Sequence, residues 1–349
     1  MTTSTMSFGD TVVAWQKKHG RHDLPWQNTK DPYRVWLSEI MLQQTQVATV
    51  RDYFARFTQR FPTVAELAAA HQDEVLGLWS GLGYYSRARN LHRAAQQIVA
   101  MHGGAFPRSA ELLQTLPGIG RSTAAAVASL CFSEPIAILD GNVKRVLTRY
   151  LGFNGDLASS RVEKELWALA QTMLPQRALQ SGMPHYTQGV MDLGATVCTS
   201  KKPQCVKCPV VHQCVAHAEG QVERYPVKTK KLKRSAEQLW LLHLVTPEGH
   251  VWLTQRPQQG VWAGLYCLPV FDSFETLQAA VPAPYRTSLA EAEPIKHVLT
   301  HKDMHLHPVV CTLPRELPFN CLQGEGRWVD EKKWPDLGLP APIRKLLLR

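Results

Sequence analysis

The chain has 349 residues, enough for two domains, and contains neither an apolar run of about 20 residues nor an apolar segment in residues 1–9. These features argue against a membrane-spanning or secreted protein and predict a cytoplasmic one. The net charge of +10 suits a polyanionic partner, although charge also serves solubility. Eight cysteines in a reducing compartment indicate metal or thiol chemistry rather than disulfides.

Helical patterns dominate the first 218 residues. The clearest lies at 31–44, where Asp31 can cap the helix N-terminus and Pro32 suits its first position. Its apolar residues form one stripe at helical spacing, namely Tyr33, Trp36, Leu37, Ile40 and Met41. Further helical runs are expected at 64–78, 86–101 and 122–130.

Glu39 lies off the apolar stripe of this first helix but has hydrophobic neighbours on it. A solvated surface glutamate is the ordinary interpretation. Partial burial would instead raise its pKa and favour the protonated form, as a proton donor requires.

Residues 116–123 read Leu-Pro-Gly-Ile-Gly-Arg-Ser-Thr, and an alanine-rich helix follows. Gly118 and Gly120 bracket Ile119, a pattern typical of the helix-hairpin-helix motif. In that motif, the N–H groups of the turn and of the next helix N-terminus bind a DNA phosphate, and Ile119 would anchor the hairpin in the core. The alternative is a simple glycine-rich turn.

Asp140 follows an apolar stretch and precedes a helix, in the segment 138–146. Capping that helix is a sufficient role by itself. A carboxylate close to a substrate is the functional alternative, and the two are compatible. Capping favours the ionised form, because N–H donors and the helix dipole stabilise the anion.

Four thiols lie within 17 residues, at Cys198, Cys205, Cys208 and Cys214. Thiolates at this spacing can surround one soft metal centre, and both zinc and an iron–sulfur cluster remain open on spacing alone. The other four cysteines are isolated and are expected to be core or incidental thiols, namely Cys131, Cys267, Cys311 and Cys321.

The sequence pattern is no longer helical after residue 218. A polar, basic stretch at 219–236 is expected to be a linker, with DNA contact as the alternative. Strands are expected at 239–246, 250–254 and 308–313, the first two joined through a turn at 247–249. The sequence thus predicts an all-α domain over 1–218 and an α+β domain over 237–349.

Taken together, these motifs resemble those of the adenine DNA glycosylases within the helix-hairpin-helix glycosylase superfamily. The resemblance covers essentially the whole chain. It is densest in seven stretches, namely 24–26, 36–50, 81–91, 116–123, 138–145, 191–195 and the cysteine motif.

The resemblance implies base-excision repair of adenine mispaired with 8-oxoguanine or guanine in duplex DNA, by a monomer associated with the bacterial nucleoid. It implies one [4Fe–4S] cluster on the four clustered cysteines, Glu39 as the catalytic acid and Asp140 as the second carboxylate. The hairpin residues Pro117, Gly118, Ile119 and Gly120 would contact DNA. Gln44 and Tyr84 would approach the 8-oxoguanine. The extruded adenine would have four neighbours, namely Gln27, Ser122, Asn142 and Gln188.

The C-terminal part resembles a Nudix-like module around residues 262–266, but the stretch after Pro269 lacks a glutamate-rich metal helix. We therefore expect lesion recognition without pyrophosphatase activity. The family's Phe-Ser-His loop corresponds to Leu299-Thr300-His301, which keeps the hydroxyl and imidazole of Thr300 and His301 but lacks the aromatic ring. Nearby histidines are expected to be structural rather than metal ligands, namely His297, His305 and His307.

Two alternatives stand beside this interpretation. Endonuclease III resembles the first domain, but its family carries a hairpin lysine where this chain has Ser122, which cannot form a Schiff base. A monofunctional glycosylase is therefore expected. A non-catalytic DNA-binding or redox-sensing protein would explain the charge, the hairpin and the thiols, but it does not require Glu39 and Asp140 together.

Overall fold

The computed structural model describes residues 6–27, 29–229, 233–314 and 326–348. It divides into two compact units. The helical unit comprises the described residues of Met1–Ala68 and Arg93–Lys231, and the sheet unit those of Ala69–His92 and Leu232–Arg349. A helical part followed by an α/β part confirms the predicted fold class. Lys230 and Lys231 of the expected linker, and Cys321, lie outside the described residues.

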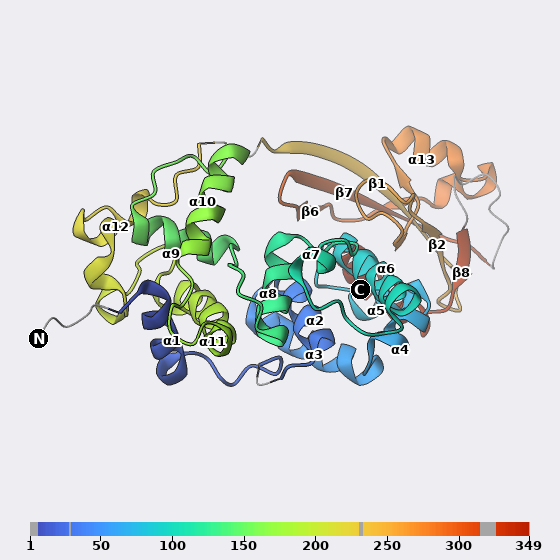
Figure 1. Cartoon of the computed structure of the whole chain (residues 1–349). Coiled ribbons are helices and arrows are strands. Elements are labelled where there is room, and N and C mark those ends of the chain that lie inside the picture. Colours follow the sequence, from blue (N-terminus) through green and yellow to red (C-terminus); the bar gives the residue numbers. More distant parts are fainter. Residues whose placement is uncertain (1–5, 28, 230–232, 315–325, 349) are drawn as a thin grey trace, which may run out of the picture. The chain divides into compact units, whose positions relative to one another are not determined.

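Helices make up nearly all regular structure before residue 225 (Figure 1). The α-helices are α1 (Phe8–His19), α2 (Pro32–Leu42), α3 (Val47–Arg60), α4 (Val64–Ala69), α5 (Gln72–Leu78), α6 (Ser86–His102), α7 (Ala110–Leu113), α8 (Arg121–Phe132), α9 (Gly141–Leu151), α10 (Ser160–Thr172), α11 (Leu179–Asp192) and α12 (Val215–Ala218). A π-helical turn (Leu193–Val197) follows α11, and short 3-10 turns span Cys205–Lys207, Val211–Gln213 and Val222–Arg224. No helix in the described ranges is long and apolar enough to cross a membrane.

Local sequence signals explain most of these helix boundaries. Asp31 caps α2 by accepting a hydrogen bond from the Tyr33 N–H at 2.9 Å, with Pro32 at the first position as predicted. The helical run expected at 64–78 is wrong as a single helix. It is two helices, because the chain leaves helical geometry at His71, whose imidazole caps the Asp73 N–H of α5 at 3.3 Å.

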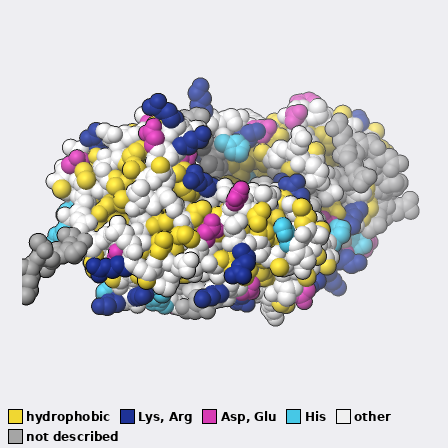
Figure 2. Space-filling model, viewed as in Figure 1, with side chains coloured by type: hydrophobic (Ala, Val, Ile, Leu, Met, Phe, Trp, Pro, Cys, Tyr) yellow, Lys and Arg dark blue, Asp and Glu magenta, His cyan; other side chains and the backbone are white. Residues whose placement is uncertain are grey.

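The helical unit has a continuous apolar interior formed by α1, α8, α9, α10 and α11. Val12, Leu147 and Val190 are fully buried within it, and Tyr186 is nearly so. Seven consecutive residues of α8, Thr123–Ser129, are also buried, because small alanines let neighbouring helices approach closely. On the face shown in Figure 2, Lys and Arg side chains lie at many separate points over this unit.

The sheet unit contains one mixed sheet with the order β3-β2-β1-β7-β5. Its strands are β1 (Ser235–Val245), β2 (Val251–Gln255), β3 (Tyr266–Cys267), β4 (Val270–Phe271), β5 (Ala290–Glu291), β6 (Ile295–Val298), β7 (Lys302–Thr312) and β8 (Gly326–Val329). The two long strands β1 and β7 run parallel along eleven residue pairs, from Ser235↔Lys302 to Val245↔Thr312 (Figure 1). The other strand pairs are antiparallel.

Apolar clusters form on both faces of this sheet. Consecutive residues of β1 point to opposite faces, so Leu241 joins the cluster containing Ile343 of α14 (Ala341–Leu347) and Leu242 joins that of Leu277. Leu277 belongs to α13 (Phe274–Ala280), which begins with a capping box between Ser273 and Thr276. Remaining 3-10 turns span Ala283–Ser288 and Trp334–Asp336.

Residues 69–92 are integrated into the sheet unit. The Tyr85 hydroxyl donates to the Leu339 carbonyl oxygen at 2.7 Å, and the Ser80 hydroxyl donates to the same oxygen at 3.0 Å. A Cβ placed on Gly77 would lie 2.1 Å from the Asp336 carbonyl oxygen, so only glycine permits this approach. The segment therefore packs with residues more than 240 positions later.

Candidate active site and metal centre

Glu39 lines a small cavity of about 60 Å³, which we call the acid cavity. The side chain is half-buried on α2, and its neighbours in the cavity wall include Leu42, Val47 and Gln188. Burial raises the pKa of Glu39 to about 7, and the nearby Asp140 carboxylate adds to the rise. A large fraction of Glu39 is therefore protonated at neutral pH, as a general acid requires.

Asp140 caps α9, and its Oδ1 accepts a hydrogen bond from the Val143 N–H at 2.7 Å. Burial raises the pKa of Asp140, while the N–H groups of Val143 and Asn142 and the cations Arg145 and Lys144 act in the opposite direction. Capping alone predicts a lowered pKa. The structure corrects that direction, because desolvation of the buried carboxyl outweighs its donors.

Three polar residues around the acid cavity hold one another in place. The Asp192 carboxylate, which is fully buried, accepts from the Arg21 backbone N–H at 2.9 Å and pairs with the Arg21 guanidinium at 2.7 Å. Gln188 Nε2 donates to the same carboxylate at 2.9 Å. The sequence singled out Gln188 but not Arg21, which follows the end of α1, or Asp192, whose only local signal is its position as a charged residue at the end of α11.

A wider cavity of about 580 Å³, which we call the wide cavity, contains Gln27 together with Gln188. Gln27 and Gln188 are thus brought together, as the resemblance implies. Asn142 and Ser122 are not among the residues that line either cavity. They lie at the N-termini of α9 and α8, where the Asn142 side-chain oxygen accepts from Arg145 at 2.8 Å.

The predicted hairpin joins α7 to α8. Ile119 is buried, whereas Gly118 and Gly120 are exposed and Pro117 is half-buried. Gly118 has φ +75°, a conformation that favours glycine, and Gly120 caps α8 without any side-chain hydrogen bond. The first N–H groups of α8 are therefore left for an external acceptor, and a Cβ built on Gly120 would meet no atom within 4 Å.

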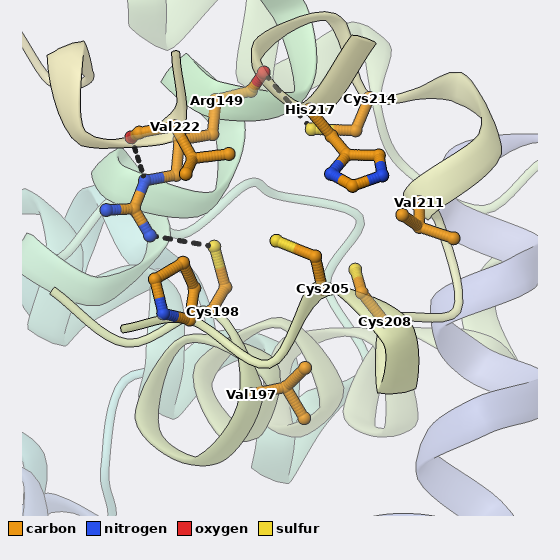
Figure 3. Close-up of a pocket in the computed structure, with 10 residues that line it drawn as sticks. Arg149, Val197, Cys198, Cys205, Cys208, Val211, Cys214, His217 and Val222 are labelled. Atoms are coloured by element: carbon orange, nitrogen blue, oxygen red, sulfur yellow. Dashed lines mark hydrogen bonds between the residues drawn. The ribbon is translucent and has the colours of Figure 1, made fainter. Parts of the chain in front are cut away.

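The four clustered cysteines line one cavity of about 30 Å³ (Figure 3). Figure 3 shows their sulfur atoms turned toward a common space. Burial raises the pKa of Cys208 to about 12, so thiolates at this site need a neighbouring positive charge, such as a metal centre supplies. Among the described residues, no three His, Cys, Asp or Glu side chains are grouped closely enough to hold one metal ion, so the four thiols around this cavity do not form a ready-made single-ion site.

Two arginines of α9 connect the Asp140 helix to the cysteine loop. Arg145 donates to the carbonyl oxygens of Cys198 at 2.8 Å and Gly194 at 2.7 Å. Arg149 is buried and donates to the Thr199 carbonyl oxygen at 2.7 Å and to Cys198 Sγ at 3.4 Å (Figure 3). Both guanidinium groups fix the cysteine loop against the helix that Asp140 caps.

A separate cavity of about 570 Å³ lies in the sheet unit, and we call it the Tyr84 cavity. Tyr84, Thr300 and His301 all line it, so the structure brings Tyr84 together with two residues that lie more than 200 positions later in the sequence. The hydroxyls of Tyr84 and Thr300 lie 2.6 Å apart. Trp262, the first residue of the stretch that resembles a Nudix-like module, also lines this cavity and adopts a positive φ of 60°. Gln44, assigned beside Tyr84 by the resemblance, is an exposed residue of the helical unit with φ 56°.

Comparisons with known proteins agree with this division. Residues 37–172 match the HhH-GPD superfamily of base excision DNA repair proteins, and residues 240–349 match the NUDIX domain. The adenine DNA glycosylase of Buchnera aphidicola subsp. Acyrthosiphon pisum is 38% identical over 97% of this chain and 96% of its own length. The chain belongs to the adenine DNA glycosylase family.

Other relatives support the same assignment. The human adenine DNA glycosylase is 31% identical over 97% of this chain and 73% of its own length. Among solved structures, a thermostable thymine-DNA glycosylase aligns with a TM-score of 0.52 at 28% identity, covering 60% of this chain and 94% of that one. An endonuclease III–DNA complex aligns at 23% identity with a TM-score of 0.50, which shows a shared fold. The adenine DNA glycosylase assignment confirms the predicted family and a DNA N-glycosylase of base-excision repair.

Proposed function

We propose that this adenine DNA glycosylase removes adenine paired with 8-oxoguanine, or with guanine, from duplex DNA, and so prevents G:C to T:A mutation. The observation that carries the proposal is Glu39, a carboxyl that lines the acid cavity and whose pKa burial raises to about 7. A group with that pKa is matched to proton donation at neutral pH.

The target adenine must leave the base stack to reach such a cavity. Protonated Glu39 then donates its proton to the adenine ring, which makes the base a better leaving group. The N-glycosidic bond breaks with oxocarbenium character at the sugar. Ionised Asp140 stabilises that positive charge, and water completes the hydrolysis.

The like charges of the two carboxyls support this division of roles. Burial first, and then the charge of ionised Asp140, raise the pKa of Glu39, so the site disfavours two ionised carboxyls. The α9 N–H groups, Arg145 and Lys144 oppose the rise that burial gives the pKa of Asp140. Asp140 is therefore the carboxyl of the pair that has donors and cations to stabilise its anion.

We further propose one [4Fe–4S] cluster on Cys198, Cys205, Cys208 and Cys214. Four thiols around one cavity with apolar valine walls fit an all-thiolate cluster, which would supply structural rigidity to the basic loop that carries Lys201, Lys202 and Lys207. Purified protein should be yellow-brown and contain about four irons per chain. Stoichiometric zinc without broad visible absorbance would contradict the assignment.

The remaining assignments follow from the same reaction. The hairpin residues Pro117 to Gly120 bind a phosphate of the DNA, and Gln27, Ser122, Asn142 and Gln188 lie near the extruded base. Since Ser122 offers no amine, the enzyme is a monofunctional glycosylase that leaves an abasic site, and it acts as a monomer.

The C-terminal part, which we assign to residues 237–349 after a linker at 219–236, recognises the lesion without pyrophosphatase activity. Its helix α13 carries a single carboxylate, Glu275, which is too few acids for a metal-dependent pyrophosphatase. Tyr84, Thr300 and His301 bind the 8-oxoguanine strand, and Gln44 also approaches the 8-oxoguanine.

The deciding experiment uses a duplex oligonucleotide with adenine opposite 8-oxoguanine. Base loss makes the strand sensitive to alkali, so strand scission after alkali and not before it is the expected result. The same duplex with thymine in place of adenine is the control. An intact adenine strand after incubation with folded holoenzyme would refute the proposal.

A further inference from the structure

Two of the proposed lesion-binding side chains stand on a very short loop. Strands β6 and β7 form an antiparallel hairpin (Figure 1), and residues 299–301, which we call the hairpin loop, connect them. Thr300 and His301 of this loop are both exposed, so burial of their side chains does not fix them. The 2.6 Å contact between the hydroxyls of Thr300 and Tyr84 therefore requires that the loop backbone be held in place.

Two adjacent residues at the start of β1 hold that backbone. The Arg234 guanidinium donates through Nη1 to the Thr300 carbonyl oxygen at 2.9 Å. The Ser235 N–H donates to the His301 carbonyl oxygen at 3.2 Å. The carbonyl groups of both lesion-binding residues are thus tied to one point of the sheet.

The direction of the Arg234 donor is set by a second contact of the same guanidinium. Its Nη2 donates to the Asp303 carboxylate on β7, and Asp303 also pairs with Lys296 of β6 at 3.7 Å. The hydrogen bond from Arg234 is the main cause that lowers the pKa of Asp303, so this carboxylate stays ionised at neutral pH. Because a guanidinium is planar and its donors keep fixed relative directions, Asp303 orients the donor that reaches Thr300.

We propose that Arg234 is a positioning residue for lesion discrimination, which ties the Thr300 carbonyl to Asp303 and so holds the Thr300 hydroxyl beside Tyr84. The inference rests on the proposed recognition of 8-oxoguanine and adds a residue that acts on the lesion only through the hairpin loop. It also separates Arg234 from the other cations of the basic stretch at 219–236, because two of its donors are used within the sheet unit.

The test compares single-turnover excision of adenine opposite 8-oxoguanine with excision opposite guanine, using the holoenzyme. Arg234→Gln and Arg234→Lys should each lower the ratio of the two rates about three- to tenfold, because neither side chain offers the planar pair of donors. Glu237→Gln is the matched control. It removes an ion pair to Lys302, 2.9 Å long, between the same two strands, and no hydrogen bond joins Glu237 to the hairpin loop. Its ratio should equal that of the unmodified protein.

A double variant shows whether Arg234 acts through Thr300. If it does, Arg234→Gln combined with Thr300→Val should lower the rate ratio by clearly less than the product of the two single losses. Losses that multiply would mean that the two residues act independently, and would overturn the proposal.

The salt dependence of duplex binding distinguishes positioning from a direct phosphate contact. Loss of one phosphate contact lowers the slope of log affinity against log salt concentration by about 0.9. A positioning residue predicts the same slope for Arg234→Gln as for the unmodified protein. A slope reduced by about 0.9 would make Arg234 a DNA-phosphate contact and would contradict the proposal.

Failure of this inference differs from failure of the proposed function. If the unmodified protein prefers 8-oxoguanine, and both Arg234 variants keep that preference with the melting temperature of Glu237→Gln, only the positioning role is wrong. If the unmodified protein shows no preference, or does not excise adenine, the proposed function itself is wrong.

Discussion

The Tyr84 cavity and the acid cavity differ both in volume, about 570 against 60 Å³, and in chemistry. Glu39 lines the acid cavity and burial raises its pKa, as burial also raises the pKa of Asp140. The Tyr84 cavity is lined by the rings of Tyr84 and Trp262 and by the hydroxyl of Thr300, and no carboxyl lies among its described lining residues. Bond cleavage requires charge in a desolvated place, whereas recognition of a base requires flat surfaces and neutral donors and acceptors.

The backbone reflects the same contrast. Tyr84 and Trp262 line one cavity and both have positive φ values, 47° and 60°, which bulky residues rarely adopt. Glu39 and Asp140 instead stand on or cap regular helices. The two candidate catalytic carboxyls therefore rely on regular helices, and the proposed recognition surface relies on strained turns held by the surrounding sheet unit.

The largest expected effect concerns Glu39. Glu39→Gln keeps the size of the side chain and its hydrogen bonding but removes the transferable proton, so single-turnover excision should fall by about 10²–10⁴-fold. Glu165→Gln, on an exposed helix surface, is the matched control and should not change the rate. If Glu39→Gln excises adenine at a rate within a few-fold of that of the unmodified enzyme, Glu39 is not the general acid and the acid cavity loses its proposed chemical role.

A thermal melt tells whether Glu39→Gln is folded. The pKa of Glu39 is raised on folding, so the unmodified protein loses stability as pH rises from about 4.5 toward about 7, where the folded carboxyl ionises. The amide of Glu39→Gln does not ionise, so the variant does not lose stability over this pH range. Glu39→Gln should therefore melt at or above the unmodified temperature at pH 8.

Asp140→Asn should reduce excision by about 10²–10³-fold, because the developing cation loses its opposing charge. Asparagine is itself a good cap, so the melting temperature should change little. Asp31→Asn provides the matched control, since Asp31 caps α2 through the same kind of contact, from the Tyr33 N–H to Oδ1 at 2.9 Å. If Asp140→Asn and Asp31→Asn excise adenine at the same rate, Asp140 acts only as a helix cap.

The pH profile distinguishes the two sites without mutation. Since Glu39 must be protonated and its pKa is about 7, the excision rate should fall above pH 7 and approach about a tenfold loss per pH unit. Binding of the lesion duplex, which involves the neutral groups of the Tyr84 cavity, should not show that step. A rate that stays level from pH 6 to pH 9 would exclude Glu39 as the acid.

The smallest expected effect concerns Thr300. Thr300→Val keeps the shape of the side chain but removes the hydroxyl that lies 2.6 Å from the Tyr84 hydroxyl. The preference for 8-oxoguanine over guanine, measured as a ratio of single-turnover rates, should fall by up to about tenfold. Tyr84→Phe should have a similar effect, and the double variant should be no worse than either alone. Additive losses would show that the two hydroxyls act separately.

Local patterns alone were sufficient for several features. The apolar stripe of α2, the Asp31 cap and the cysteine spacing each depend on residues a few positions apart, so the sequence predicts them directly. The hairpin with buried Ile119 and exposed glycines also follows from local stereochemistry. The break between α4 and α5 was missed, because a histidine cap carries little statistical signal.

The sequence by itself determined the family and the fold class, because several short motifs together identify a family. The resemblance to that family then singled out the two candidate carboxyls, each of which taken alone has an ordinary structural explanation. Only the tertiary structure decided that Asp140 has a raised pKa, since burial depends on every element packed around it. It also decided that Arg21 and Gln188 share the buried Asp192, and that residues 69–92 pack with the sheet that brings Thr300 to Tyr84. The Arg21–Asp192 and Tyr84–Thr300 contacts join residues 171 and 216 positions apart, and no local periodicity records such pairings.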